Sequence, residues 1–451
     1  MRRAAAALAS RARETVRRVR HSQRDIGMAL ADQSAVSLTS FATTLVIGRT
    51  AGPSALALYA LGVTSLLVVT TVQDSLMSAP YTIYGQRLSR AQRANYAGST
   101  LVFCGALALV AATLLAGGGL LLLAGFGSAA LGHVLLVAAA VAPAVVLREF
   151  ARRVSAADLH MGIALVLDVA VGVLQLAGLA WLVSRGAVSA ESGLALAGLA
   201  SGIGAAAWLA AWHWSGRIRV HVEGLGPAWR QHWALGRWVA AGRLIGQLNS
   251  DMLLLWVLTF SVGAATAGAF AACLTLAFIA NPLVLGAGLF LTPALAARAV
   301  TGGVAAVARH ARATMAMLGV AFLAFVSVIA VVGEPLLATA YGPAFAGFGL
   351  TATIVAAAVG IGALSLGPTT ALLVVERPAL DVVANLLGLG ALIAGAAALI
   401  PAYGATGAAL AFVAGNTVQL LARLVLLARV VAGTTAGSLA PMETLTGEEA
   451  I

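Results

Sequence analysis

The chain has 451 residues, of which 61% are hydrophobic and 10% charged, and its mean hydropathy is +0.97. This composition leaves too little polar surface to cover a water-soluble globule, so a soluble fold is excluded. All 27 basic residues are arginine and only 16 residues are acidic, which gives a formal net charge of +11. Because the arginines flank apolar stretches and form no soluble patch interleaved with aromatic residues, no nucleic-acid partner is expected.

Apolar stretches follow one another along the whole chain, each about as long as the roughly 20 residues that a helix needs to cross a bilayer. We predict twelve of them, at 26–48, 55–79, 97–124, 129–149, 160–184, 190–212, 236–261, 264–292, 311–333, 348–374, 379–401 and 405–428. They are continuous and rich in leucine and alanine rather than alternating, which favours helices over the strands of a membrane barrel. The predicted fold class is all-α, a polytopic membrane protein with about twelve transmembrane helices.

The arginines lie almost entirely on alternate connections between these stretches. The other set of connections holds only Arg49 and Arg185. Because positive charge resists translocation, the arginine-rich side is predicted to face the cytoplasm, with both chain ends inside a multi-pass cell membrane protein. Residues 1–25 are predicted to be a basic cytoplasmic segment, either a helix on the inner leaflet or an irregular tail, and 429–451 a cytoplasmic tail.

The longest connection, 213–235, divides the chain into an N-terminal six-helix lobe over 26–212 and a C-terminal six-helix lobe over 236–428. Six of the eight tryptophans cluster around this connection, so 228–238 is predicted to be an interfacial helix. The segment 52–60 matches 263–271 at an offset of 211 residues, and both link the first two spans of their half. Halves duplicated in parallel orientation imply a pseudo-twofold axis along the membrane normal, with a central cleft as the pathway.

Short motifs placed in order along nearly the whole chain carry a family resemblance. They are Asp32-Gln33, Arg49-Thr50-Ala51-Gly52-Pro53 and Tyr59-Ala60-Leu61, the run from Leu147 to Arg153, Gly236-Arg237-Trp238, Asn281-Pro282, the run from Gly333 to Leu337 with Tyr341-Gly342, and the run from Tyr403 to Ala409. In these motifs the chain resembles polysaccharide flippases of the Wzx type, which belong to the multidrug/oligosaccharidyl-lipid/polysaccharide exporter superfamily.

The resemblance implies two six-helix lobes around a central cleft that work by alternating access. It also implies the substrate, an oligosaccharide on a polyprenyl diphosphate carrier that is moved from the inner to the outer leaflet. The product would be an envelope polysaccharide such as O-antigen or exopolysaccharide. The expected partners are this lipid-linked glycan and membrane lipids, with a coupling cation or proton and a glycan polymerase as further candidates.

Charged and polar residues inside the apolar stretches are the candidate pathway residues, because they are costly in lipid and usually face protein or water. Asp32 and Arg243 are related by the offset of 211, so we expect them to meet across the axis as an inner gate when the protein opens outward. The alternative is a snorkelling arginine and a capping aspartate. Asp251 lies near the middle of span seven beside Gln247 and Asn249. It is either the site of a coupling ion or a buried carboxylate whose hydrogen bonds are all made within the protein.

Asp168 in span five, and Gln73 and Asp74 late in span two, are further pathway candidates, although helix capping or headgroup contact also explains Asp74. Arg49 lies at the outer end of span one. It either binds the diphosphate after the transporter has opened outward, since guanidinium makes bidentate bonds to phosphate, or it anchors the helix at the membrane–water interface.

A cluster of three arginines, Arg148, Arg152 and Arg153, is predicted to attract the anionic carrier lipid on the cytoplasmic side. The alternative is that these arginines reflect only the cytoplasmic position of their connection.

Several other functions fit the sequence less well. A pump with a phosphate-binding loop needs a lysine in that loop, and the chain has none. An ion-coupled multidrug or cation extruder of the same superfamily stays open as an alternative. An integral-membrane glycan polymerase is disfavoured, because the outer connections offer only Arg49, Arg185, Glu191 and Glu334. We therefore expect a transporter rather than an enzyme, with no metal site and no cofactor.

Overall fold

The computed structural model describes residues 2–158, 160–221 and 224–436, and every regular element in these ranges is helical. The first half contains α1 (Arg2–Gln73), the π-helical turn η1 (Asp74–Ser78), α2 (Ala79–Gly85), α3 (Arg90–Leu121), η2 (Leu122–Phe126), α4 (Ala129–Ala157), α5 (Met161–Ser184) and α6 (Ala190–Trp214). The second half contains α7 (Leu225–Leu248), α8 (Asp251–Ser261), α9 (Ala264–Ala277), η4 (Phe278–Ala280), α10 (Asn281–Ala340), η5 (Pro343–Phe345), α11 (Gly349–Leu364), α12 (Leu366–Val374) and α13 (Pro378–Ala436). The predicted all-α membrane fold class is confirmed.

Among the described residues, nine helices are long and apolar enough to cross a membrane, or ten if the bent pair of α7 and α8 forms one span. Two of these candidates, Leu30–Gly85 and Pro378–Gly433, are 56 residues long. At about 1.5 Å per residue, each would be far longer than the roughly 30 Å of hydrocarbon. Each is interrupted by a glycine outside the helical region, Gly52 in α1 and Gly404 in α13. Counting each of the two as a pair of spans gives the predicted twelve.

The turns that follow the first span of each half share one backbone feature. Gly52 has a φ of 82° and Gly263 a φ of 126°, values that glycine adopts readily because it lacks a Cβ atom. The two glycines are 211 residues apart, which is the offset of the predicted repeat. The repeat therefore places equivalent turns in the two halves.

Span seven, predicted as one helix over 236–261, is broken in the structure. Helix α7 ends at Leu248 and α8 begins at Asp251, and the two are bent by 52°. The Ser250 hydroxyl accepts a hydrogen bond from the backbone N–H of Met252 at 3.3 Å and so caps α8. The break falls at Asn249-Ser250 because such side chains bind nearby backbone groups and compete with the helix.

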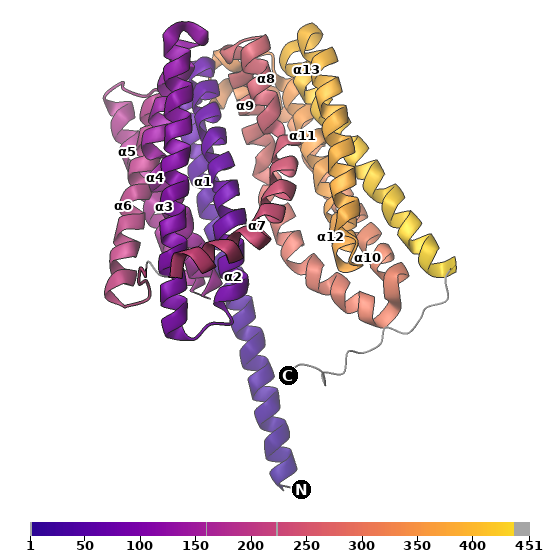
Figure 1. Cartoon of the computed structure of the whole chain (residues 1–451). Coiled ribbons are helices and arrows are strands. Elements are labelled where there is room, and N and C mark those ends of the chain that lie inside the picture. Colours follow the sequence, from indigo (N-terminus) through magenta and orange to yellow (C-terminus); the bar gives the residue numbers. More distant parts are fainter. Residues whose placement is uncertain (1, 159, 222–223, 437–451) are drawn as a thin grey trace.

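Helix α7 lies across the end of the first-half helices in Figure 1. A Cβ atom at Gly236 would be 2.7 Å from the Cα atom of Leu76, so the two backbones pack closely. His232 is fully buried, whereas Trp229, Trp233 and Trp238 are exposed. Exposed indoles on a helix of this kind fit the predicted interfacial helix, whose place in a membrane stays a prediction.

We call the end of the bundle with the arginine-rich connections the inner end and the opposite end the outer end. We call α1 to α6 the N-terminal lobe and α8 to α13 the C-terminal lobe; in Figure 1 they form two bundles whose ribbons diverge toward the inner end. At the outer end the lobes share a hydrophobic core that joins Leu56 and Leu131 to Phe270 and Tyr341. At the inner end each lobe has its own core, one with Phe150 and Trp208 and with residues of α7, the other around Leu295 in the C-terminal lobe.

Candidate functional site

Eight charged residues near the inner end of the N-terminal lobe form one connected network. Its members come from α1, η1, α4, α5 and α7: Asp32, Asp74, Arg148, Glu149, Arg152, Arg153, Asp168 and Arg243. We call this set the inner charge network. It holds four guanidinium groups and four carboxylates, so the charges balance. Balance of this kind allows ionised groups to lie within apolar helices.

Asp168 lies at the buried side of the network, and its side chain is 0% exposed. The Arg148 Nη2 atom is 2.6 Å from Asp168 Oδ1, and the Arg152 Nε atom is 2.8 Å from Asp168 Oδ2. Arg152 also reaches Asp32 Oδ2 at 3.3 Å and Glu149 Oε2 at 3.2 Å. One guanidinium therefore holds three carboxylates, while the buried Oδ1 atom of Asp32 has no hydrogen-bond partner among the described residues.

Asp74 lies at the open side of the network, at the start of the π-helical turn η1. Its carboxylate forms an ion pair with Arg243 of α7 and lies 3.3 Å from the Nε atom of Arg153, which is also 2.7 Å from Glu149 Oε1. The side chains of Arg153 and Arg243 are each 46% exposed. These ion pairs, rather than helix capping, account for Asp74, and π-helical turns often occur at functional sites.

These contacts bear on two predictions from the sequence. Asp32 and Arg243, expected to meet in the outward-open state, bind Arg152 and Asp74 here, so their pairing stays a prediction for another conformation. Within the predicted lipid-attracting cluster, Arg148 and Arg152 are held by carboxylates. Of the three, Arg153 is the most exposed, and the attraction of an anionic lipid by this cluster stays a prediction.

The polar residues predicted in span seven lie at its break. Asp251 stands in the first turn of α8, where a carboxylate is favoured by the helix dipole. The Asn249 Nδ2 atom is 3.5 Å from the backbone carbonyl of Asn385, and the Gln247 carbonyl accepts a hydrogen bond from the Ser250 hydroxyl at 2.6 Å. All of them therefore contribute to the junction between α7 and α8, a role that a continuous helix would not have given them.

Gln73, predicted as a pathway residue, lies inside the packed N-terminal lobe. It is fully buried and donates to the Val146 carbonyl at 2.8 Å, with Cys104 Sγ at 3.7 Å. These contacts tie the end of α1 to α3 and α4.

A second polar cluster lies in the C-terminal lobe and was not predicted from the sequence. The Arg423 Nε atom donates to Asp381 Oδ1 at 2.7 Å, and Arg423 Nη2 donates to Asn385 Oδ1 at 3.0 Å. Gln419 also binds Asn385, and Thr369 binds Asp381. The spacing of these residues could have indicated the cluster. Asp381 lies four residues before Asn385, and Gln419 four residues before Arg423, so each pair shares a helix face.

At the outer end, Arg49 joins the two lobes. Its guanidinium donates to the carbonyls of Thr339, a short contact, and of Ala340, at 2.9 Å, in the last turn of α10. Cations are favoured at the C-terminal end of a helix, where carbonyls lack partners within the helix. A Cβ atom at Gly268 would lie only 1.8 Å from the backbone oxygen of Pro53, so α9 and α1 pack backbone to backbone beside this contact.

No protein-family model and no curated protein sequence matches the chain. Solved structures do match. An inward-facing multidrug resistance MATE family transporter of the MOP superfamily has a TM-score of 0.73 at 14% identity, over 90% of this chain and 96% of that one. An outward-facing structure of such a transporter scores 0.63 at 13% identity, over 92% and 96%. The lipid II flippase MurJ in an inward closed conformation scores 0.68 at 11% identity, over 89% and 87%. The chain thus has the fold of MATE transporters and of MurJ.

Proposed function

We propose that the protein is a flippase that moves a polyprenyl-diphosphate-linked oligosaccharide from the inner to the outer leaflet by alternating access. In this proposal the arginine-rich inner end faces the cytoplasm. The glycan and diphosphate pass between the lobes while the prenyl tail stays in lipid. The resulting glycan would serve the synthesis of an envelope polysaccharide.

The observation that carries the proposal is the uneven packing of the two lobes. They share one hydrophobic core at the outer end but are packed as separate units at the inner end. This arrangement is what a transporter closed to the outside and open to the inside requires. The higher TM-score with the inward-facing MATE structure than with the outward-facing one, 0.73 against 0.63, supports the same state.

The substrate class is inferred from the open side of the inner charge network. Arg153 from α4 and Arg243 from α7 share the carboxylate of Asp74 and are both half-exposed. A diphosphate offers several anionic oxygens to two guanidinium forks and so competes with Asp74 for them. That one of the proteins with this fold is a lipid II flippase also favours a lipid-linked glycan.

The same contacts suggest a cycle. Release of Arg243 from Asp74 would free it to meet Asp32, the pair expected at the inner gate of the outward-open state. Opening of the outer end requires Arg49 to leave the Thr339 and Ala340 carbonyls, after which it is free to meet the diphosphate. A double charge swap, Asp32→Arg with Arg243→Asp, should recover the transport lost in the single variants only up to the level of Arg243→Gln, because it restores the gate but not the bond from Arg243 to phosphate. Failure to rescue either single variant would count against the gate.

An ion-coupled multidrug or cation extruder is the second candidate. It is favoured by the MATE-like fold and by Asp32, whose buried Oδ1 atom has no hydrogen-bond partner in the part of the chain that is described. Such an oxygen is available to a proton or a cation. In the flippase, the same carboxylate would couple lipid movement to an ion gradient.

The test is complementation of a strain that lacks its own oligosaccharide-lipid flippase, with surface polysaccharide as the readout. Arg153→Gln and Arg243→Gln should each reduce the rate at which surface polysaccharide appears about tenfold. The reason is that each substitution removes a charge-assisted bond to phosphate. Arg298→Gln is the matched control, an exposed arginine of the same end with no partner among the described residues, and should leave the rate unchanged. Normal transport in both variants would refute the proposal. If the protein does not complement the strain but everted vesicles that contain it take up ethidium, the extruder is favoured instead.

A further inference from the structure

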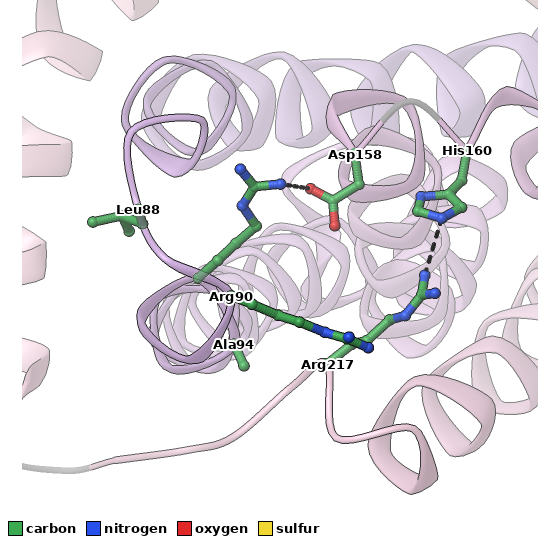
Figure 2. A pocket seen from close by; sticks show the side chains of 7 residues that line it. Leu88, Arg90, Ala94, Asp158, His160 and Arg217 are labelled. Carbon is green, nitrogen blue, oxygen red and sulfur yellow. Dashed lines mark hydrogen bonds and ion pairs between the residues drawn. The ribbon is translucent and has the colours of Figure 1, made fainter.

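A pocket of about 450 Å³ opens at the inner end of the N-terminal lobe, where three connections of that lobe converge (Figure 2). Its lining comes from the turn before α3, the start of α3, the junction of α4 and α5, and the segment after α6: Leu88, Arg90, Arg93, Ala94, Asp158, His160 and Arg217. The volume lies in the range of about 300–1,000 Å³ that is typical of small-molecule sites. No residue of the inner charge network lines it, so this pocket is a separate site.

The pocket has an excess of positive charge. Three guanidinium groups face one carboxylate, that of Asp158. Asp158 already has partners: its Oδ1 atom lies 3.5 Å from Arg93 Nη1 and accepts a hydrogen bond from the Tyr81 hydroxyl at 3.4 Å. Arg90, by contrast, is exposed and has no ion pair or hydrogen bond of its side chain within the described ranges. A net positive charge of about +2 therefore lines the cavity.

His160 adds a buried donor to this site. The Arg217 Nη1 atom lies 3.2 Å from His160 Nε2. Because arginine only donates, Nε2 must accept this bond, and the proton of the neutral ring then lies on Nδ1. The Nδ1 atom is buried and has no hydrogen-bond partner in the described structure, and Figure 2 shows it on the side of the ring that faces Asp158. The bond from Arg217 to Nε2 thus holds one guanidinium group at this cavity, which both residues line.

Neighbouring contacts hold Arg217 and its segment in place. The Arg217 guanidinium lies 5.3 Å from the ring centroid of Trp212, an arrangement that stabilises its position. The segment after α6 runs against α3, where the backbone N–H of Arg219 donates to the Ala94 carbonyl at 3.0 Å. A Cβ atom at Gly98 would lie 2.1 Å from the Arg219 carbonyl oxygen, so the close approach requires glycine. Preorganised donors of this kind lose little freedom on binding.

We propose that this pocket binds a phosphate group. A phosphate has several anionic oxygens, enough for Arg90 and Arg217 at once, and as a dianion it matches the excess charge. The group belongs either to the headgroup of an anionic lipid of the inner leaflet or to a soluble phosphate. Either ligand would fasten the segment between α6 and α7 to the N-terminal lobe. The proposal is independent of what the protein transports.

The experiment uses the full-length protein purified in detergent. Native mass spectrometry measures binding of phosphatidic acid, with phosphatidylcholine as the reference lipid, and calorimetry measures binding of inorganic phosphate. Arg90→Gln and Arg217→Gln should each weaken binding roughly tenfold, the effect of one lost charge-assisted bond. Arg87→Gln is the matched control: it is an exposed arginine of the same turn that does not line the pocket, and it should leave binding unchanged.

The two arms identify the source of the phosphate. Variant-sensitive binding of phosphatidic acid supports a lipid headgroup, and variant-sensitive binding of inorganic phosphate alone supports a soluble ligand. The proposal is overturned if neither ligand binds more weakly to the Arg90→Gln protein than to the unchanged one. It is also overturned if Arg87→Gln causes the same loss. Because Arg90 has no structural partner, its replacement is not expected to affect folding.

Discussion

Replacing Arg49 with glutamine should shift the protein toward a state that is open at the outer end. The substitution removes both bonds from the guanidinium to the last carbonyls of α10. Charge-assisted hydrogen bonds contribute about 1.5–3 kcal/mol each, and exposure of Arg49 lowers that value, so the two together contribute about 1–2 kcal/mol. The ratio of outer-open to outer-closed molecules should therefore rise roughly 5- to 30-fold.

Distances between spin labels at the outer ends of the two lobes would measure this shift. Ala130→Cys and Ser261→Cys are exposed positions on either lobe, and both native cysteines are buried and so protected from labelling. Arg185→Gln is the matched control, because Arg185 packs against a tryptophan of its own lobe and not across the interface. We expect a longer-distance population in the Arg49→Gln protein only. Unchanged distances would show that this contact does not hold the outer end closed.

Two further predictions concern packing and charge inside the membrane. Gly268→Ala should lower the free energy of unfolding by about 1–3 kcal/mol, because its Cβ atom would overlap the backbone of Pro53. Gly105→Ala is the control: a Cβ atom there would have nothing within 4 Å, so this substitution should stabilise the protein slightly. Equal melting temperatures of the two variants would contradict this prediction. Asp168→Asn should destabilise by about 3–5 kcal/mol, since it leaves two guanidinium groups without their buried carboxylate. Glu191→Gln, in the first turn of α6, should cost less than about 1 kcal/mol, and a comparable loss in both variants would refute the importance of the network.

Much of the fold could be predicted from local sequence properties. The apolar stretches predicted the membrane helices, because crossing hydrocarbon requires about 20 apolar residues in succession. The repeat at an offset of 211 predicted equivalent turns, and Gly52 and Gly263 provide them. The break in span seven was missed, because its mean hydropathy does not reveal that Asn249-Ser250 caps a new helix.

The candidate site depended far more on tertiary structure. The sequence identified Asp32, Asp74, Asp168 and Arg243 as unusual, because charges within apolar helices are costly wherever they occur. Their partners could not be predicted, since Asp32 binds an arginine 120 positions away. Glu149 was not a candidate at all, and only the structure shows it bridging two arginines of the network.

The sequence by itself determined that the chain is a bundle of membrane helices with its arginines concentrated at one end. Apolar length and charge placement are local properties, and they act on each helix before the helices associate. Only the tertiary structure decided which charges neutralise one another and at which end of the bundle the two lobes share a core. Those outcomes depend on contacts between helices that are distant in sequence, such as the two bonds from Arg49 to the end of α10.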